Sequence, residues 1–246
     1  MRRAPVAYAL TLQLLCAAGA GAFPANPSFE DGDLGGWIAV GNADADGTWR
    51  SSAPTDGSYQ AIVRTSGSAV VRSIAETALG LTDNTLQILF DDSLGSISTG
   101  SGPIEGSAIQ QSFDALAGDV LSFDWNFVTR EDPSETLTTD FLWQHLSLPD
   151  GSSNSGVLAH AAQPASDFFN AQSPSFQQTG YETFSFTLPQ DGTYTFSAGV
   201  FDVQETNRDS FGVFDNFSVF RAPEPGTAGL LGLGLAILGS RRQPRR

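Results

Sequence analysis

Apolar and polar residues alternate along six stretches in the middle of the chain. The clearest is 120–128, in which Leu121, Phe123, Trp125 and Phe127 share one face at a period of two. The same period recurs in the stretches 107–113, 140–148, 181–188, 193–201 and 212–220. Because successive side chains of a strand point to opposite faces, this pattern, bounded by Gly, Asp and Asn, predicts half-buried antiparallel strands. Many short strands of this kind predict a two-sheet β-sandwich.

One region departs from the period of two. Between residues 73 and 90, Ile74, Ala75, Ala78 and Leu79 recur at helical spacing, which predicts one or two short helices inserted between strands. No internal repeat is visible. The predicted fold class is therefore all-β, an antiparallel sandwich that occupies residues 23–221.

The first 22 residues have the features of a secretory signal peptide. Arg2 and Arg3 precede the largely apolar run Val6–Ala18, and Ala20 and Ala22 form a small-residue cleavage pattern. The apolar run is too short to span a bilayer and is followed by a polar domain. We therefore expect residues 1–22 to direct export through the secretion machinery and to be removed near Ala22.

The last 25 residues, 222–246, form a second segment outside the sandwich. Pro223-Glu224-Pro225 holds the chain extended. An uncharged apolar run, 227–239, follows it and ends at Arg241 and Arg242, which would stay on the cytoplasmic side of a membrane. A spanning helix needs about 20 residues, so this shorter run predicts a transient membrane helix rather than a lasting anchor.

This tripartite tail resembles the PEP-CTERM sorting signal of Gram-negative bacteria. The resemblance covers the Pro-Glu-Pro motif, the apolar helix and the arginine cluster, in that order. It implies that an exosortase processes the chain near Pro225, after transient association with the inner membrane. It also implies a location at the cell surface or in the extracellular matrix.

Composition narrows the set of partners. Between residues 23 and 222, six arginines and no lysine face 26 acidic residues, a formal charge of −20. Such a surface repels nucleic acid and anionic lipid, whereas it is compatible with divalent cations or simply with solubility. The only cysteine, Cys16, lies in the signal segment, so the exported domain has no disulfide.

The sandwich itself resembles the jelly-roll carbohydrate-binding modules. The residues that carry this resemblance are Asn26-Pro-Ser-Phe-Glu30 followed by Gly36-Trp37, together with 54–61, 106–113, 117–127 and 213–219. The later segments also resemble exported PEP-CTERM proteins built on such a sandwich. The resemblance implies a structural calcium ion shared by Glu30 and Asp215, which would tie the first strand to the last. Calcium takes six to eight oxygen ligands; the alternative is that Glu30 only hydrogen-bonds backbone.

A second acidic segment, 42–48, has oxygen-bearing side chains at alternate positions, among them Asp44 and Asp46, and a glycine at the sixth position. These features match the first half of an EF-hand loop. The twelfth position is Ala53, so the bidentate glutamate is missing. We therefore interpret the segment as a solvated turn.

Four tryptophans offer possible sugar-stacking surfaces. Trp125 and Trp143 lie within apolar strands and are expected in the core. Trp49 is flanked by polar turn residues, which makes it the best candidate for an exposed ligand-binding ring.

The chain lacks the usual catalytic constellations. His145 and His160 are the only histidines and have no zinc-like spacing, and no Gly-x-Ser-x-Gly elbow is present. The abundant carboxylates leave a polysaccharide-acting hydrolase as the least favoured alternative. The leading hypothesis is a non-enzymatic exported protein held at the cell surface or in polysaccharide. The alternative is a lectin-like carbohydrate-binding module.

Overall fold

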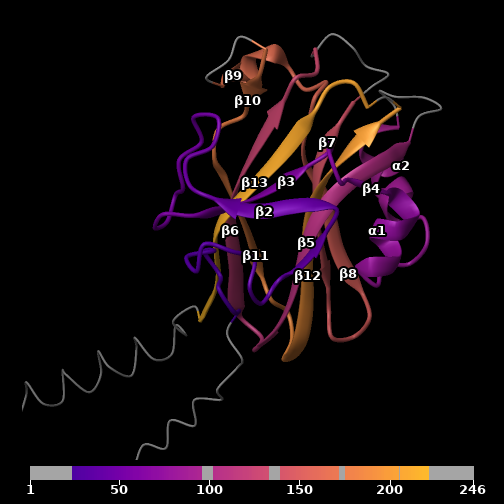
Figure 1. Ribbon diagram of the computed structural model, residues 1–246. Coiled ribbons are helices and arrows are strands. Elements are labelled where there is room, and N and C mark those ends of the chain that lie inside the picture. The colour runs from indigo at the N-terminus through magenta and orange to yellow at the C-terminus, as the bar shows by residue number, and fades with distance from the viewer. Residues whose placement is uncertain (1–23, 96–101, 133–138, 172–174, 205, 222–246) are drawn as a thin grey trace, which may run out of the picture.

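The computed structural model describes residues 24–95, 102–132, 139–171, 175–204 and 206–221 (Figure 1). Two antiparallel sheets and two helices make up this part of the chain, so the predicted sandwich with inserted helices is confirmed. The two terminal segments lie outside the described residues, with Ala20 and Ala22 in the first and the Pro223–Pro225 motif, Arg241 and Arg242 in the second. Within the described ranges, no helix is long and apolar enough to cross a membrane.

The first sheet, sheet A, has a five-strand path with one additional strand. Its order is β1 (Ile38–Val40), β5 (Pro103–Ala115), β12 (Gly192–Val203), β7 (Phe141–Ser147) and β8 (Ser153–His160), and β4 (Val70–Val71) also pairs with β5. β8 is therefore an edge strand.

The second sheet, sheet B, has seven strands. Its order is β2 (Asn42–Asp46), β3 (Gln60–Arg64), β13 (Ser210–Arg221), β6 (Asp119–Thr129), β10 (Gln177–Gln178) and β9 (Phe169–Asn170), and β11 (Glu182–Thr187) pairs with the other half of β6. A 3₁₀ turn, Ala165–Asp167, precedes β9. Figure 1 shows β9 and β10 at one end of the sandwich.

The main core lies between the sheets and follows the predicted alternation. Leu121, Phe123, Trp125 and Phe127 are buried in it together with side chains from β5, β12 and β13. Trp143 is also fully buried, but on the other face of sheet A. The prediction that Trp125 and Trp143 are core residues is thus confirmed.

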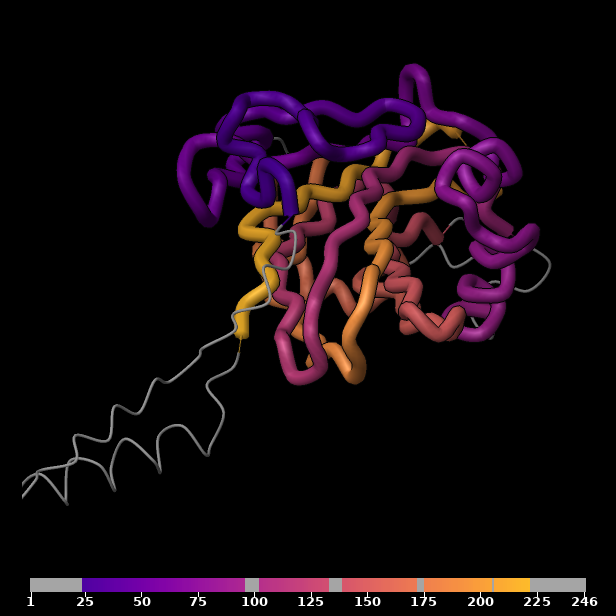
Figure 2. Tube along the Cα trace, turned by 90° about the horizontal axis from the view of Figure 1, so that it is seen from below, coloured from indigo at the N-terminus to yellow at the C-terminus, as the bar shows by residue number. Residues whose placement is uncertain are grey.

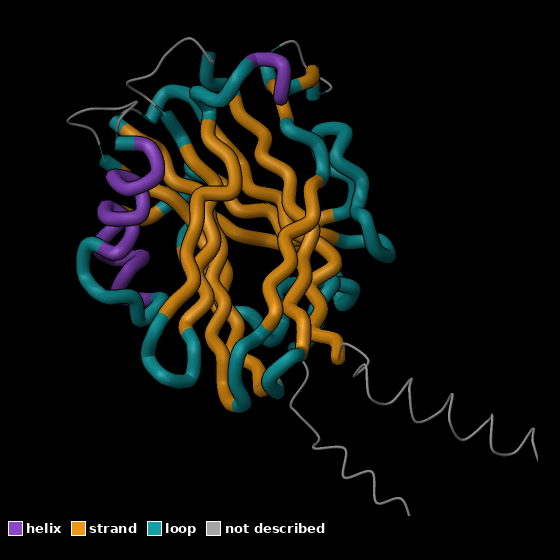
Figure 3. The backbone as a smooth tube through the Cα atoms, turned by 180° about the vertical axis from the view of Figure 1, so that it is seen from behind, coloured by secondary structure: helices purple, strands orange, loops and turns teal. Residues whose placement is uncertain are grey.

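The two helices cover the outer face of sheet A (Figures 2 and 3). They are α1 (Arg72–Ala78) and α2 (Thr85–Leu94). Their apolar side chains pack with Trp143, Phe141 and Phe201 in a second core. Gln110 Nε2 of β5 donates to the backbone oxygen of Leu79 at 2.7 Å, which fixes the end of α1 against the sheet.

The segment 42–46 is a strand, so its interpretation as a solvated turn is wrong. It pairs along its whole length with β3, and Arg64 Nη1 of β3 lies 2.8 Å from Asp44 Oδ1. An acidic strand is tolerated here because β2 is at the edge of sheet B, where its carboxylates reach solvent. The segment that follows, 47–59, crosses the outer face of sheet B and builds the candidate site.

Candidate ligand-binding site

A buried polar network holds the segment 47–59 against sheet B. Ser52 Oγ donates to Gln178 Oε1 of β10 at 3.0 Å and accepts from Asn126 Nδ2 of β6 at 2.5 Å. Gln60 Nε2 donates to the backbone oxygens of Gly47 at 2.6 Å and Ser52 at 2.8 Å. Buried polar groups cost free energy unless they are paired, so these bonds set the position of the segment.

A second set of contacts fixes the far end of this segment. The carboxylate of Asp215 accepts the backbone N–H groups of Thr55 at 2.6 Å and Asp56 at 3.0 Å. Thr55 Oγ1 lies 2.8 Å from an oxygen of Asp124 and 3.2 Å from one of Asp215. Burial raises the pKa of Asp215, although these hydrogen bonds oppose the shift.

Trp49 stands at the start of a tight turn on this surface. It is half-buried and its ring centroid lies 4.5 Å from that of Phe211. The guanidinium carbons of Arg50 and Arg64 lie 4.8 Å and 5.9 Å from the Trp49 ring. The ring predicted as an exposed sugar platform is therefore packed against a phenylalanine and covered in part by arginine.

An open polar pocket lies beside this turn, at the end of the sandwich where β6, β9 and β10 meet. It has a volume of about 490 Å³ and is lined by Arg130, Glu131, Asp132, Asn170, Ser175, Phe176, Gln177 and Arg208. We call it the arginine pocket. Arg208 Nη1 lies 3.4 Å from Glu131 Oε2, and Arg130 Nη1 lies 4.0 Å from Asp209 Oδ2.

The arginine pocket and the turn share one aromatic ring. Phe176 is buried, with the guanidinium carbon of Arg50 3.8 Å and that of Arg130 5.3 Å from its centroid. Guanidinium groups stack favourably on aromatic faces. The surface therefore presents guanidinium, amide and carboxylate groups, all planar hydrogen-bonding groups, around a rigid apolar centre.

A second hollow lies on the opposite sheet, between α2 and the hairpin β7–β8. It consists of two adjoining pockets of about 420 Å³ and 310 Å³, which share Thr85 and Ser153. His145 lines it, with Nδ1 2.7 Å from Ser155 Oγ and Nε2 3.1 Å from Ser147 Oγ. Burial lowers the pKa of His145, so the ring is neutral at physiological pH and suited to hydrogen bonding rather than to charge recognition.

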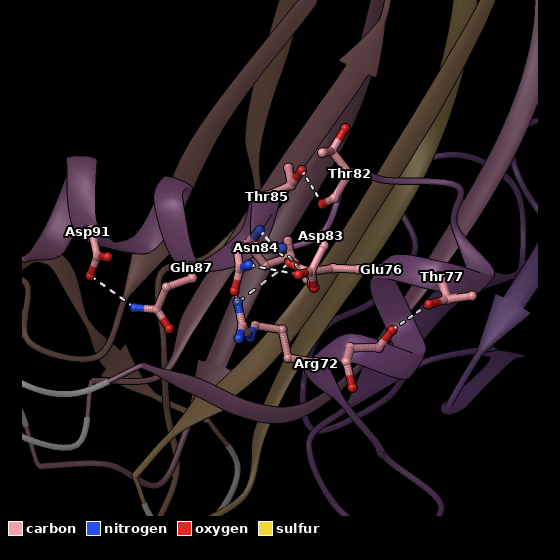
Figure 4. A network of polar contacts seen from close by, with 11 residues as sticks. Arg72, Glu76, Thr77, Thr82, Asp83, Asn84, Thr85, Gln87 and Asp91 are labelled. Carbon is pink, nitrogen blue, oxygen red and sulfur yellow. Dashed lines mark hydrogen bonds and ion pairs between the residues drawn. The ribbon is translucent and has the colours of Figure 1, made fainter.

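The helix α2 forms one side of this second hollow, and Glu76 of α1 binds the start of α2 (Figure 4). The N-terminus of α2 has no side-chain cap of its own, and Asn84 at that position has a left-handed φ of 68°. The buried Glu76 carboxylate accepts the N–H of Leu86 at 2.8 Å and that of Asn84 at 3.1 Å, and Arg72 Nη1 lies 3.8 Å away. A carboxylate is favourable at a helix N-terminus, so α1 supplies the cap that α2 lacks.

Glu30 and Asp215, the predicted calcium ligands, both bind the segment 54–59 by accepting backbone N–H groups. Glu30 Oε1 accepts from Ser58 and Tyr59, each at 2.9 Å, which is the alternative considered for this residue. Among the described residues, no group of three or more acidic, histidine or cysteine side chains is placed to hold a metal ion. Amide donors aimed at both carboxylates fit calcium poorly, and the calcium site stays a prediction.

Sequence reasoning located part of this surface. Trp49 was identified, whereas Arg50, Arg130 and Arg208 were not. The available signal was the scarcity of arginine, since only six lie in the domain and four of them, counting Arg64, gather here.

Comparisons with known proteins find similar structures but assign no family. No family model and no curated protein matches the chain. Among solved structures, TmCBM61 in complex with β-1,4-galactotriose is 13% identical with a TM-score of 0.45, covering 82% of this chain and 99% of that one. The CBM22-1 xylan-binding domain from Paenibacillus barcinonensis Xyn10C is 12% identical with a TM-score of 0.33, covering 84% and 100%. A cleaved adhesin domain of Lys-gingipain from Porphyromonas gingivalis W83 is 11% identical with a TM-score of 0.38, covering 80% and 96%. At this level of similarity none of them assigns a function.

Proposed function

We propose that this chain is a non-enzymatic exported protein that binds extracellular polysaccharide through the arginine pocket. The observation that carries the proposal is the pocket itself, in which Arg130, Arg208, Asn170 and Gln177 surround the buried ring of Phe176. The two terminal segments support export and retention, because they resemble a signal peptide and a PEP-CTERM tail processed by an exosortase.

The chemistry of the arginine pocket suits sugar hydroxyl groups. Neighbouring hydroxyls on a sugar ring offer paired donors and acceptors, which planar amide, guanidinium and carboxylate groups meet in a bidentate manner. A volume of about 490 Å³ is within the range of small-ligand sites, roughly 300–1,000 Å³. The pocket is open at the surface, so a short part of a polymer can occupy it while the rest of the polymer stays in solvent.

Binding to polysaccharide tests this function directly. The protein is run by affinity electrophoresis through gels that contain xylan, galactan or polygalacturonate. Asn170→Ala removes an exposed amide from the pocket, and we expect about tenfold weaker binding, the equivalent of roughly one hydrogen-bonded pair. Thr85→Ala, in the second hollow, is the matched control and should leave binding unchanged.

The two variants distinguish three outcomes. Binding that is lost in Asn170→Ala and kept in Thr85→Ala supports the arginine pocket. The reverse pattern moves the site to the hollow between α2 and β8. Absence of retardation in every gel overturns the polysaccharide function.

A purely structural role at the cell surface is the second candidate. The observation that favours it is the packing of the tryptophans, since Trp37, Trp125 and Trp143 are buried and Trp49 is half-buried against Phe211. A structural protein would bind no polymer in the gels yet still fractionate with the cell envelope or matrix.

A further inference from the structure

The turn that carries Arg50 is a strained hairpin. Trp49 and Ser52 exchange both backbone hydrogen bonds, with N···O distances of 2.9 Å and 2.8 Å. The two central residues, Arg50 and Ser51, have φ angles of 45° and 69°, the pattern of a type I′ turn. Asn and Gly are the residues that adopt this turn readily. Arginine and serine do so at a cost, and such strain is concentrated at functional sites.

The turn is also firmly held. Its last residue, Ser52, is buried and hydrogen-bonded to Gln178, Asn126 and Gln60. The strained conformation therefore persists because sheet B determines it, and the consequence of that conformation is the position of one side chain. Arg50 lies over Phe176, beside Trp49 and 5.4 Å from the centroid of Phe211.

Arg50 is a cation without a counter-ion. Within the described part of the chain it makes no ion pair, and its Nε is buried without a hydrogen-bond partner. Burial and the charges of Arg130 and Arg64 lower the pKa of Arg50, and the charge of Asp209 offsets only part of this shift. The attraction of an anion placed against this guanidinium would offset the free-energy cost of burying the charge and of its repulsion by the neighbouring arginines.

We propose that Arg50, which lies over the ring of Phe176 beside the arginine pocket, is the residue that recognises anions there, and that it binds the carboxylate groups of a uronate-containing polysaccharide. This inference rests on the proposed polysaccharide function and specifies its substrate class. A guanidinium binds a carboxylate through two parallel hydrogen bonds, while the adjoining Arg130, Asn170 and Gln177 take the ring hydroxyls.

The charge of the whole domain favours carboxylated sugar over denser anions. A formal charge of −20 on the domain repels closely spaced phosphates or sulfates at long range. A polymer with at most one carboxylate on each sugar ring meets less of this repulsion and can present a single anion to Arg50. The structure therefore points to a uronate rather than to nucleic acid or a sulfated polymer.

The test uses the protein with three polymers in one buffer. These are polygalacturonate, the same polymer after chemical reduction of its carboxyl groups, and dextran sulfate. We expect binding to polygalacturonate to be about tenfold tighter than binding to the reduced polymer. Arg50→Gln should abolish this difference by weakening the binding of polygalacturonate. Arg221→Gln removes an exposed arginine at the C-terminal end of β13. It should leave the preference for polygalacturonate unchanged.

One further variant and the data on the unaltered protein keep the result interpretable. Ser51→Gly relaxes the turn without removing the guanidinium, so it should preserve the preference for polygalacturonate. The comparison of the three polymers with the unaltered protein does not depend on any variant folding.

The outcomes separate the two proposals. Equal binding of polygalacturonate and its reduced form overturns the role of Arg50 and leaves polysaccharide binding standing. Stronger binding of dextran sulfate than of polygalacturonate also overturns the carboxylate assignment. Binding of none of the polymers overturns the inference together with the function on which it rests.

Discussion

Asp140 and Asp202 place two carboxyl groups together inside one end of the sandwich. They are 0% and 2% exposed, and they lie close enough that each carboxyl group affects the pKa of the other. Asp140 Oδ1 also accepts the backbone N–H of Val203 at 3.1 Å. Asp140 Oδ2 and Asp202 Oδ1 are buried without a hydrogen-bond partner among the described residues. Ionising both of two adjacent buried carboxyl groups has a large free-energy cost, so the pair retains a proton.

The surroundings strengthen this effect. Burial raises the pKa of Asp202 from 3.8 to about 7, and the charges of Glu105 and Asp209 add to the shift. Burial raises the pKa of Asp140 as well, with further contributions from Asp202 and Glu131.

The sign of the pH dependence follows from these raised values. Between about pH 4 and pH 7, the folded protein holds a proton at Asp202 that the unfolded chain has lost, so stability falls as the pH rises through this window. A shift from 3.8 to about 7 corresponds to about 4 kcal/mol. Because the two acids share the proton, we expect roughly half of this, on the order of 2 kcal/mol, to be recovered when one acid is made neutral.

The perturbation is Asp202→Asn, which keeps the shape of the protonated acid. Urea unfolding at pH 5 and pH 8 measures the free energy of unfolding of both proteins. We expect the variant to be more stable than the parent by less than about 1 kcal/mol at pH 5, because part of the window lies below that pH, and by about 2 kcal/mol at pH 8. His145 and His160, whose pKa values burial lowers, are common to both proteins and cancel in the comparison. The exposed substitution Asp92→Asn should show no such difference.

A variant that is equally or less stable at pH 8 would refute the shared-proton interpretation. It would mean that the two carboxylates are separately solvated or are neutralised by a cation. A chelator that lowered the stability of the parent at pH 8 would then show that a metal ion is bound.

Three further predictions concern other parts of the molecule. Glu76→Ala leaves two backbone N–H groups of α2 without their partner, so thermal or urea unfolding should show a loss of about 1–3 kcal/mol; an unchanged midpoint would mean that water replaces the cap. Calcium at Glu30 and Asp215 predicts a higher melting temperature with calcium than with chelator, and identical melts would remove calcium as a stabilising ion. Deletion of the chain from Pro223 onward should shift the protein between cell-envelope and medium fractions, and an unchanged distribution would count against the sorting signal.

Sequence periodicity predicted the long strands because one face of each carries mostly apolar side chains and the other mostly polar ones. β6 buries Leu121, Phe123, Trp125 and Phe127 in the main core, so the period of two is visible. β8, Ser153–His160, was missed because an edge strand with one half-exposed face carries few apolar side chains. The two-residue strand β4 is defined by its pairing with β5, in which Val70 lies opposite Gly106, a partner far away along the chain.

The helices were predicted in the right place, but the contribution of their polar residues was not. Ala75 and Leu79 are buried as their spacing suggested, whereas Ile74 is 55% exposed. The residue between them, Glu76, is buried as well. Its carboxylate caps a different helix, α2, and no local pattern in α1 reveals such a tertiary role.

The candidate site was harder to predict than the fold because its residues come from distant segments. Trp49 was selected as a candidate because its neighbours in the sequence are polar. Those neighbours form the turn that positions Arg50. Arg130 and Arg208 come from the ends of other segments and reach the same pocket only through the pairing of β6 with β10 and β13. Arginine count limits the possibilities, but only the sheet order shows which arginines meet.

The positive charge of Arg50 and the negative charge of the domain as a whole both affect which polymers bind. Long-range repulsion from a formal charge of −20 acts on every charge of an approaching polymer, while Arg50 attracts only the one carboxylate that it contacts. Long-range repulsion is screened over about 8 Å at physiological ionic strength, whereas a contact that is partly buried is screened much less. Salt should therefore weaken the repulsion more than the contact. Binding of a uronate polymer should depend less on salt than binding to an ordinary basic protein surface, and affinity should fall as the charge density of the polymer rises.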